Sequence, residues 1–283
     1  MLKLNKLATR PKVFKTLCGL SPQQFKDLLG KLEPLWSEAE RRRKSRLDRK
    51  RKIGGGDRPK LRVAELLFMV LMYYRTYAGQ VFVGAVVGLD TSNVGRWIGR
   101  LEPVLAQIFR IPKQKIDLTE HELWELIVDA TEQETQRRKG TRYSGKKHQQ
   151  TIKTQIHVDR KGIIKAVSDS MPGNRHDKHL YDESKTYVRS RGRPVRVKKH
   201  GDLGYLGTEC DLPIKKPKSR PLMMHEKYVN HQQAKKRIAV EHTLCHLKQW
   251  RILADRYRHN PKRYNLTFRN IAGLRNFIRT SAH

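Results

Sequence analysis

The sequence predicts an all-α N-terminal region followed by an α/β domain whose mixed sheet is flanked by helices. Apolar residues recur at helical spacing from about residue 22 to residue 101. Pro103 and Pro112 should break that pattern, and beyond them short β-branched segments alternate with turns before one long helical segment. A chain of 283 residues can bury a sizeable core and is long enough for two domains. We therefore expect one domain over residues 1–115 and another over residues 116–283.

Two helices are expected first in the N-terminal region. Ser21 offers a capping hydroxyl and Pro22 suits the first helical position, so a helix should start there. It leads into a basic run between Arg41 and Lys52 that Gly54-Gly55-Gly56 ends. Such a run either contacts phosphates or is a solvated helix end, and the overall charge favours phosphates. Val63 to Tyr77 is apolar and lacks Gly and Pro, which predicts a buried helix.

The next two segments have the spacing of a helix-turn-helix. Gln80 to Val87 is apolar, Gly88-Leu89-Asp90 supplies a turn, and Ser92 can cap a second helix. Apolar residues form the inner face of that helix: Val94, Trp97, Ile98 and Leu101. If the helix entered a major groove, its outward residues could reach bases or phosphates: Asn93, Arg96 and Arg100. Many helical hairpins share this spacing, so a hairpin without a DNA-binding role remains the alternative.

The charge of the chain points to a polyanionic partner. There are 61 Lys and Arg residues against 27 Asp and Glu residues, which gives a formal net charge of +34. Lys and Arg neutralise phosphates and release counterions, so this charge predicts salt-sensitive binding to nucleic acid. A general RNA-binding protein would carry the same charge. A membrane surface is the competing polyanion.

A membrane protein is not expected. The most apolar stretch, Leu66 to Tyr74, is far shorter than the roughly 20 residues that cross a bilayer. The N-terminus has no signal peptide, which favours the cytoplasm. The three cysteines, Cys18, Cys210 and Cys245, are scattered and predict neither a disulfide framework nor a zinc site.

The α/β domain should begin with a strand and a hairpin. The segment Trp124-Glu-Leu-Ile-Val-Asp129 is predicted to be a buried strand that ends on a carboxylate, after a linker or capped turn over Asp117–Glu122. Thr151 to Asp159 alternates, Asp159-Arg-Lys-Gly162 turns, and Ile163 to Val167 returns.

A helix, one or two strands and a long helix complete the predicted order. His176-Asp177 opens a helix toward Val188, where a role for Asp177 at the helix start is sufficient. Pro194 to His200 is expected to be a strand that leads to Gly201-Asp202, and Leu212 to Lys215 an edge strand. The last helix should run from about Lys227 to Ala254.

This order brings two carboxylates to one place. The first and fourth strands can lie parallel and side by side after a crossover, which puts Asp129 and Asp202 at the same end of the sheet. Ligands of open α/β sheets gather at the carboxyl ends of strands. Together with a third acid on a helix, Glu241, they suit a two-metal site that activates a nucleophile for phosphoryl transfer.

The third acid lies on a polar stripe of the last helix. Arg237, Glu241 and Lys248 are four and seven residues apart, which places them on one face. Val240, Leu244 and Leu247 form the apolar stripe beside it, through which the helix could aim Glu241 at the sheet. The alternative is an ordinary surface ion pair between Arg237 and Glu241, worth about 0.3 to 0.5 kcal/mol.

These motifs resemble those of the DDE transposases of bacterial insertion sequences, which have an RNase H-like catalytic domain and are related to Harbinger-type nucleases. The resemblance covers nearly the whole chain. It rests on the segments Ile127-Val-Asp129-Ala-Thr131-Glu132, Tyr143-Ser-Gly145-Lys146-Lys147-His148, Asp202-Leu-Gly204-Tyr205-Leu-Gly207 and Arg237 to Lys248 followed by Trp250-Arg251-Ile252-Leu253. The chain departs from the family pattern at Ala234, where related groups have tyrosine, and at Leu203, where a basic residue is frequent.

The resemblance implies a metal-dependent DNA transposase. Asp129, Asp202 and Glu241 would be the catalytic acids and would bind two Mg²⁺ or Mn²⁺ ions, while the other acids Glu132 and Asp159 are interpreted as structural. Phosphates would be held by Arg237, Lys248, Lys146, Lys147 and His148. The partners would be double-stranded DNA, as terminal inverted repeats and target, and a second copy of the chain in a homodimer on paired ends.

The resemblance also implies a place in the cell and leaves an alternative. A bacterial transposase of this kind would be cytoplasmic and associated with the nucleoid. The alternative is a catalytically retired or domesticated copy that acts as a DNA-binding protein. Such a copy would bind repeats without metal-dependent cutting.

Overall fold

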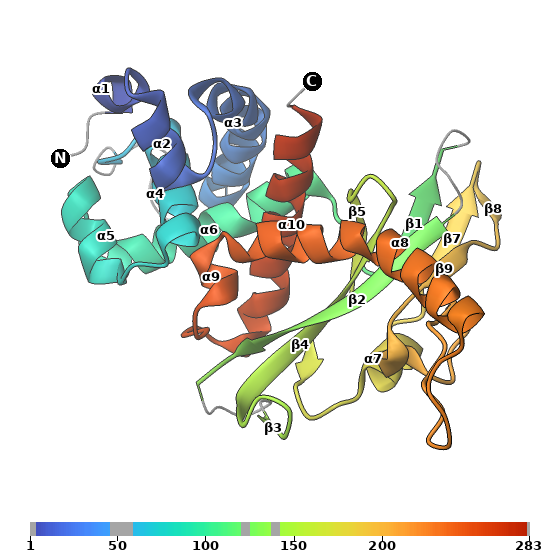
Figure 1. Ribbon diagram of the computed structural model, residues 1–283. Helices are drawn as coiled ribbons and strands as arrows, with labels where there is room; N and C mark the ends of the chain where they lie inside the picture. The colour runs from blue at the N-terminus through green and yellow to red at the C-terminus, as the bar shows by residue number, and fades with distance from the viewer. Residues whose placement is uncertain (1–3, 46–58, 120–124, 137–141, 282–283) are drawn as a thin grey trace. The chain divides into compact units, whose positions relative to one another are not determined.

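The chain forms two compact units. Figure 1 shows the computed structural model, which describes residues 4–45, 59–119, 125–136 and 142–281. The first unit comprises residues 1–110, 250–252 and 280–283, and the second comprises residues 111–249 and 253–279. Neither unit is a single continuous piece of chain. None of the helices in the described ranges combines the length and the apolarity needed to cross a bilayer.

The first unit is helical and is built around α4. All residues of α4 from Leu66 to Tyr74 are buried, and α2, α3, α5 and α6 all pack against it. The predicted buried helix is therefore present. The helices of this unit are α1 (Leu4–Ala8), α2 (Pro11–Cys18), α3 (Pro22–Lys44), α4 (Val63–Thr76), α5 (Gln80–Val87) and α6 (Thr91–Phe109).

The predicted N-terminal cap is present in α3 but not in α6. The Ser21 hydroxyl accepts a hydrogen bond from the Gln24 amide, and the Gln24 side chain accepts one from the Ser21 amide, so α3 begins with the expected cap. The prediction that Ser92 caps α6 is wrong. Asp90 is the cap, and its carboxylate accepts from the Ser92 amide at 2.8 Å.

Pro103 does not end a helix as predicted. It lies inside α6, which continues to Phe109 before Arg110 adopts a left-handed conformation. Leu101, Val104 and Leu105 are buried around it, and this packing outweighs the one backbone hydrogen bond that a proline removes. Of the basic run, residues 41–44 lie in the last turn of α3, and residues 46–58, with the three glycines, lie outside the described residues.

Trp250 belongs to the first unit although it follows α8 in the chain. Its side chain is 3% exposed. A Cβ added at Gly19 would lie 2.5 Å from its ring, and Gly19 also has φ +80°, so only glycine fits there. The Arg75 guanidinium lies over the same ring, 5.7 Å from the centroid.

The second unit is built on a six-stranded mixed sheet with the strand order β3-β4-β2-β9, in which β5 and β6 also pair with β4. The predicted hairpin is confirmed: β4 pairs antiparallel with β5, and the Asp159 carboxylate accepts from the Ile163 amide in the turn. Gly162 takes the left-handed conformation there, with φ +73°. The strands are β2 (Glu125–Glu134), β3 (Arg142–Ser144), β4 (Gln149–Val158), β5 (Ile164–Val167), β6 (Met171–Pro172) and β9 (Lys198–His200).

A second, three-stranded sheet accounts for several differences from the sequence prediction. β1 (Lys115–Leu118) pairs parallel with β7 (Tyr187–Ser190), which pairs with β8 (Arg193–Pro194). Asp117 therefore lies in a strand and not in a linker, and the helix expected to approach Val188 stops at Glu183. The single strand expected over Pro194–His200 is divided between β8 and β9. Residues 120–124, which include Trp124, lie outside the described residues.

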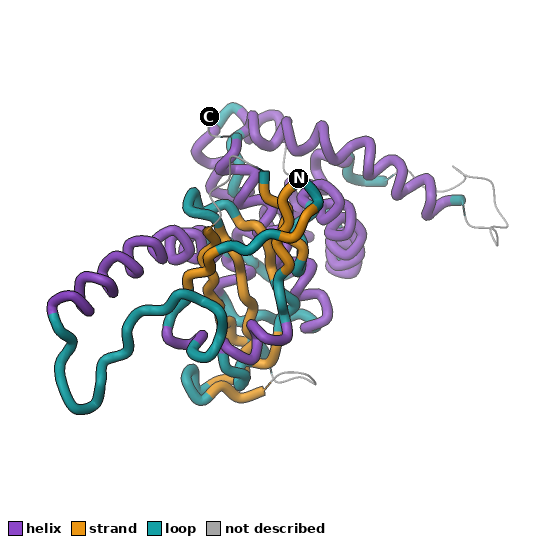
Figure 2. The backbone as a smooth tube through the Cα atoms, turned by 90° about the vertical axis from the view of Figure 1, so that its right-hand side faces the viewer, coloured by secondary structure: helices purple, strands orange, loops and turns teal. Residues whose placement is uncertain are grey.

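The helices of the second unit lie on the large sheet. α8 (Met224–Lys248) packs against β2, β4 and β9 and is reached through a long loop that follows η1 (Leu203–Tyr205) (Figure 2). The long helix predicted to reach Ala254 is interrupted after Lys248, since Trp250 packs into the first unit and α9 (Arg251–Ala254) starts anew. The expected strand over Leu212–Lys215 is absent in this described segment. α7 (Asp177–Glu183) and α10 (Pro261–Thr280) complete the unit.

Candidate active site

Asp129 lies on β2, and Asp202 follows β9, the parallel strand beside it. β2 pairs parallel with β9, and Ile127 of β2 stands opposite His200 of β9. Each aspartate lies two residues beyond that pair. The parallel pairing predicted from the sequence is therefore present. The prediction that the first strand ends at Asp129 is wrong, because β2 continues to Glu134 through its antiparallel pairing with β4.

A glycine lets a third carboxylate approach this pair. The Asp202 carboxylate accepts a hydrogen bond from the Gly204 amide at 2.9 Å and caps the 3₁₀ turn η1. A Cβ added at Gly204 would lie 2.9 Å from the Asp202 carboxylate and 2.7 Å from the Asp177 carboxylate. Asp177 and Asp202 thus reach the same glycine from different elements. From the sequence, the position of Asp177 at a helix start was sufficient to explain it.

Lys153 holds Asp177 in place. Its ammonium lies 3.0 Å from the Asp177 carboxylate and donates to the Arg175 carbonyl at 2.9 Å. Lys153 comes from β4 and is only 9% exposed, so this ion pair is shielded from solvent. The signal that could have identified Asp177 is its place after β6, whose partner β4 lies beside the strand that carries Asp129.

The environment of Asp129 disfavours its charged form. Burial raises the pKa of Asp129 to about 6. The carboxylates of Asp202 and Asp177 push its pKa in the same direction, whereas the Ala130 amide and the Arg237 guanidinium oppose the rise. Three acids therefore share one partly buried region. Groups of this kind favour binding of a cation, because a cation offsets their mutual repulsion.

Tyr205 forms a wall of this region. Its side chain is fully buried, and its hydroxyl has no hydrogen-bond partner among the described residues. Burial raises its pKa, and the charges of Asp129, Asp177 and Asp202 act in the same direction. The Tyr205 ring packs in an apolar cluster with Val128, the residue before Asp129. That packing links η1 to β2 and so fixes the loop that carries Asp202.

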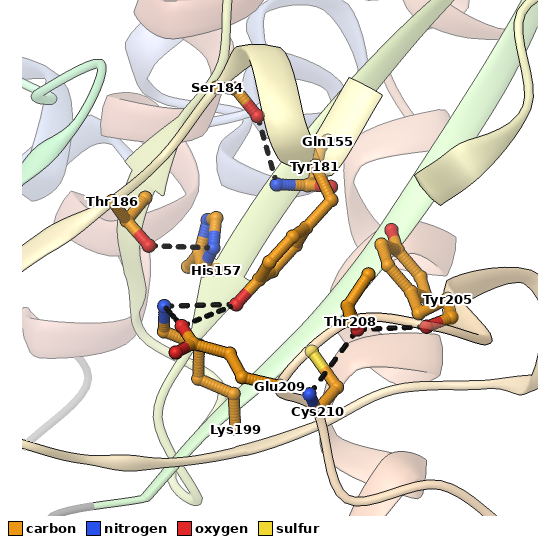
Figure 3. A network of polar contacts seen from close by, with 10 residues as sticks. All are labelled: Gln155, His157, Tyr181, Ser184, Thr186, Lys199, Tyr205, Thr208, Glu209 and Cys210. Atoms are coloured by element: carbon orange, nitrogen blue, oxygen red, sulfur yellow. Dashed lines mark hydrogen bonds and ion pairs between the residues drawn. The ribbon is translucent and has the colours of Figure 1, made fainter. Parts of the chain in front are cut away.

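A polar network next to this cluster holds the segment after η1 (Figure 3). The Lys199 ammonium donates to the Tyr181 hydroxyl at 3.0 Å and to the Glu209 carboxylate at 2.7 Å, and Tyr181 donates to the same carboxylate at 2.9 Å. The Thr208 hydroxyl donates to the Tyr205 carbonyl at 2.8 Å. β9, α7 and the loop after Asp202 are thereby tied together.

Glu241 lies on α8 and is exposed. Its side chain is 54% exposed and its nearest cation is Arg237, at 3.7 Å, so the ordinary helix ion pair considered above is present. The Nε of Arg237 is buried without a hydrogen-bond partner in the described chain, and the charge of this guanidinium lowers the pKa of Asp129. Arg237 thus acts on both acids. Lys248, further along the same face, is exposed.

Asp129, Asp202 and Glu241 do not form a closed metal-binding cluster. Within the ranges that the structure describes, no three His, Cys, Asp or Glu side chains lie close enough together to hold a metal ion. The structure brings Asp129 and Asp202 together, adds Asp177, and leaves Glu241 apart on its helix. The metal-binding role of the three acids stays a prediction. Glu132 and Asp159 have structural partners, Thr151 and Ile163.

The residues predicted to bind DNA differ in exposure and in the side chains that they contact. Arg96 is exposed and bonds Asn93 at 2.5 Å on the surface of α6. Arg100 is engaged within its own unit, because it pairs with Glu40 and stacks on Trp97 at 4.1 Å from the ring centroid. The turn after β3 presents three exposed side chains, those of Lys146, Lys147 and His148.

Comparison with protein families matches segments of both units. The family model described as "DDE superfamily endonuclease" matches residues 128–276, and the model "Helix-turn-helix of DDE superfamily endonuclease" matches residues 59–111. The chain belongs to the DDE superfamily endonucleases, and the comparisons support a transposase of the insertion-sequence type. The helix-turn-helix and the family predicted from the sequence are confirmed.

Two curated relatives carry the names of insertion-sequence transposases. One, from Microchaete diplosiphon, is named "Probable transposase for insertion sequence element IS702" and is 29% identical over 270 residues, 93% of each chain. Another, named as a transposase for insertion sequence element IS112 of Streptomyces albus G, is 28% identical over 258 residues, 88% of each chain. No solved structure matches the chain.

Proposed function

We propose that the protein binds the terminal inverted repeats of its own element, cleaves DNA there and joins the freed 3′ ends to target DNA. The observation that carries this proposal is the position of Asp129 and Asp202, each two residues beyond the paired Ile127 and His200 of adjacent parallel strands. The raised pKa of Asp129 supports it, because the nearby carboxylates of Asp202 and Asp177 contribute to the rise and a bound cation would offset their repulsion. The charge of +34 supplies the attraction for DNA.

Divalent metal ions fit the donor set of this site. Carboxylate oxygens are the ligands that Mg²⁺ and Mn²⁺ prefer, and the repulsion among the acids around Asp129 would be offset by such ions. Asp129, Asp202 and Glu241 would hold two ions, which would activate water or a 3′-hydroxyl and stabilise the departing 3′ oxygen. The ion pair of Glu241 with Arg237 is long and exposed, so it holds the carboxylate only weakly.

The basic residues would position DNA around these acids. Arg237 and Lys248 lie on the same face of α8 as Glu241 and would contact the phosphates next to the cut. The exposed turn with Lys146, Lys147 and His148 would contact phosphates further along the strand. Asn93 and Arg96 are proposed to contact the repeat from α6, whereas Arg100 is held by Glu40 and the Trp97 ring. A homodimer would hold the two ends of the element together.

The test is cleavage of DNA that carries the terminal repeats of the element, with Mg²⁺ or Mn²⁺ and with a chelator as the control. We expect Asp129→Asn, Asp202→Asn and Glu241→Gln each to lower the rate by roughly 1,000-fold, since each removes a proposed metal ligand. Glu183→Gln, which removes an exposed acid of α7, is the matched control and should cut normally.

The same assay separates the alternatives. Unchanged cleavage by Glu241→Gln would show that another group supplies the third carboxylate. Salt-dependent binding to the repeats without metal-dependent cutting by the wild type would instead identify a retired copy that only binds DNA. Preference for RNA, with no effect of the acids, would identify a general RNA-binding protein.

A further inference from the structure

A basic pocket lies in the second unit, away from the candidate active site. Its volume is about 560 Å³, and its lining residues come from the β4–β5 turn, α8 and α10. No Asp or Glu is among the described residues that line it. Two of the cations that line the pocket, Arg160 and Lys236, pair with Glu125. The other four have no carboxylate within 4.0 Å in the described chain: Lys161, Lys235, Arg275 and Arg279.

Arg275 has buried hydrogen-bond donors that lack a partner. Its side chain is only 7% exposed, yet its Nε and one of its terminal nitrogens have no hydrogen-bond partner in the described residues. Buried polar groups in proteins are nearly always hydrogen-bonded, and a guanidinium left unpaired is costly. Burial lowers the pKa of Arg275, the charge of Arg279 adds to this effect, and Asp159 opposes it. A ligand with anionic oxygens would satisfy these donors.

The walls of the pocket are ordered. The Thr243 hydroxyl lies 3.1 Å from the Gly162 carbonyl and 2.8 Å from the Ala239 carbonyl, which ties the β4–β5 turn to α8. A Cβ at Gly162 would lie 3.0 Å from the Thr243 hydroxyl, so glycine permits this close approach. The turn therefore presents Lys161 from a fixed position.

The pocket and the proposed catalytic acids occupy opposite faces of α8. The pocket residues Lys235, Ala239, His242 and His246 follow helical spacing. At about 100° per residue, Arg237 lies about 180° and Glu241 about 140° around the helix axis from the middle of this series. Val240 and Leu247, which are buried, lie between the two faces. A ligand in the pocket would not share the phosphate at the catalytic acids.

The lining favours a phosphate chain over a nucleotide base. The described lining contains no Phe, Tyr or Trp ring, the large rings on which bases stack most often, whereas lysine and arginine supply donors for several phosphate oxygens. We propose that this pocket binds backbone phosphates of DNA at a distance from the reacting phosphate and so anchors the duplex on the second unit. This inference rests on the proposed function, since it takes DNA as the substrate.

The experiment measures binding of the full-length protein to duplex DNA, without metal, over a range of salt concentrations. The double variant Lys161→Gln/Lys235→Gln changes two exposed residues of the rim and should preserve the fold. We expect its salt slope, the change in log K per log salt, to fall by about 2, since about 0.9 is lost per phosphate contact. The matched control Lys185→Gln/Lys216→Gln removes two exposed cations elsewhere and should change the slope less.

A second variant addresses the buried donor. Arg275→Gln should weaken DNA binding by roughly tenfold with the loss of about one phosphate contact, and thermal unfolding is measured beside it to check the fold. Equal salt slopes for the wild type, the rim variant and the control would overturn the proposal. Competition by inorganic phosphate or ATP at this pocket, with DNA binding unchanged in the rim variant, would identify a free-anion site and overturn it as well.

The binding experiment tests the pocket separately from the proposed cleavage activity. If the wild type bound DNA through the pocket but did not cut terminal repeats, the anchor would stand and the proposed function would fail. If it cut the repeats while the rim variant bound DNA with an unchanged slope, the proposed function would stand and the anchor would fail.

Discussion

Asp177 and Asp202 approach each other across Gly204, a residue that has no room for a side chain. A Cβ at that glycine would lie 2.7 Å from one carboxylate and 2.9 Å from the other. Two acids of like charge, one from α7 and one that caps η1, therefore lie beside the same glycine. Such an arrangement is costly without a nearby cation, and Lys153 supplies one. A change in the conformation of the backbone at Gly204 would therefore change the distance between the Asp177 and Asp202 carboxylates.

The substitution Asp177→Asn should lower DNA cleavage although Asp177 is not among the three family acids. It removes a charge that acts on Asp129 and leaves Lys153 without its ion-pair partner. We expect a loss of about tenfold to a hundredfold in the cleavage rate, with DNA affinity changed less than threefold. The comparison is Asp182→Asn on the same helix, which removes an exposed acid paired with Lys178. Equal rates for the two variants would show that Asp177 only starts the helix.

The substitution Gly204→Ala should reduce cleavage by tenfold or more. The new methyl group would contact both carboxylates below van der Waals distance, so at least one carboxylate, or the element that carries it, must shift. Gly145→Ala is the control, because a Cβ there meets nothing within 4 Å. Rates at saturating DNA are measured for both. A Gly204→Ala protein with wild-type activity would mean that the spacing of Asp177 and Asp202 does not matter to the reaction.

Substitution of Arg96 should weaken DNA binding, whereas substitution of Arg100 should lower the stability of the fold. Arg100 stacks on Trp97 and pairs with Glu40, so Arg100→Ala should lower the free energy of unfolding by about 1 to 2 kcal/mol. Arg96→Ala should leave stability within about 0.5 kcal/mol while it weakens binding to the terminal repeat. Denaturant titration and DNA titration of both variants provide the check. A large stability loss for Arg96→Ala would contradict this division.

His157 should make the protein less stable in acid. Burial, followed by the charge of Lys199, lowers its pKa from 6.5 to about 3. The unfolded chain takes up a proton near pH 6.5 and the folded chain does not, so stability is complete above that pH and is lost as the pH falls toward 3. The loss from this group is at most about 1.4 kcal/mol per pH unit.

The variant His157→Gln isolates this effect. The difference between wild-type and variant unfolding free energies is measured from pH 7 to pH 4, so that other titrating groups cancel. Asp129 contributes with the opposite sign between its two pKa values, because its pKa is raised in the folded state. Parallel stability curves for the two proteins would contradict the assignment to His157.

Local patterns in the sequence predicted the elements whose structure is set locally. The cap of α3 at Ser21, the hairpin turn after Val158 and the buried run of α4 all follow from neighbouring residues. The pairing that aligns Asp129 with Asp202 was also accessible, since the parallel crossover is a general rule of such sheets.

Long-range pairing could not be predicted in the same way. Val188 lies in a strand because β1, about 70 residues earlier, pairs with it, and nothing in its own neighbourhood signals this. The role of Asp177 was hidden for a related reason, because a position at a helix start explained the residue fully by local criteria. Arg100 was expected to face outward, but two tryptophans from α3 and α6 cover it.

The location of Trp250 has a consequence for how this protein can be taken apart. A fragment that starts near residue 116 would carry Trp250 without Gly19 and Arg75, the residues against which its ring lies. That fragment would expose an indole ring that the complete chain buries, and the remaining helices would lack the ring that occupies their interior. The N-terminal helices therefore do not form a complete unit without the segment around Trp250. Exchange of DNA-binding specificity between relatives would have to carry the short segment around Trp250 together with the N-terminal helices, as two separate stretches of gene.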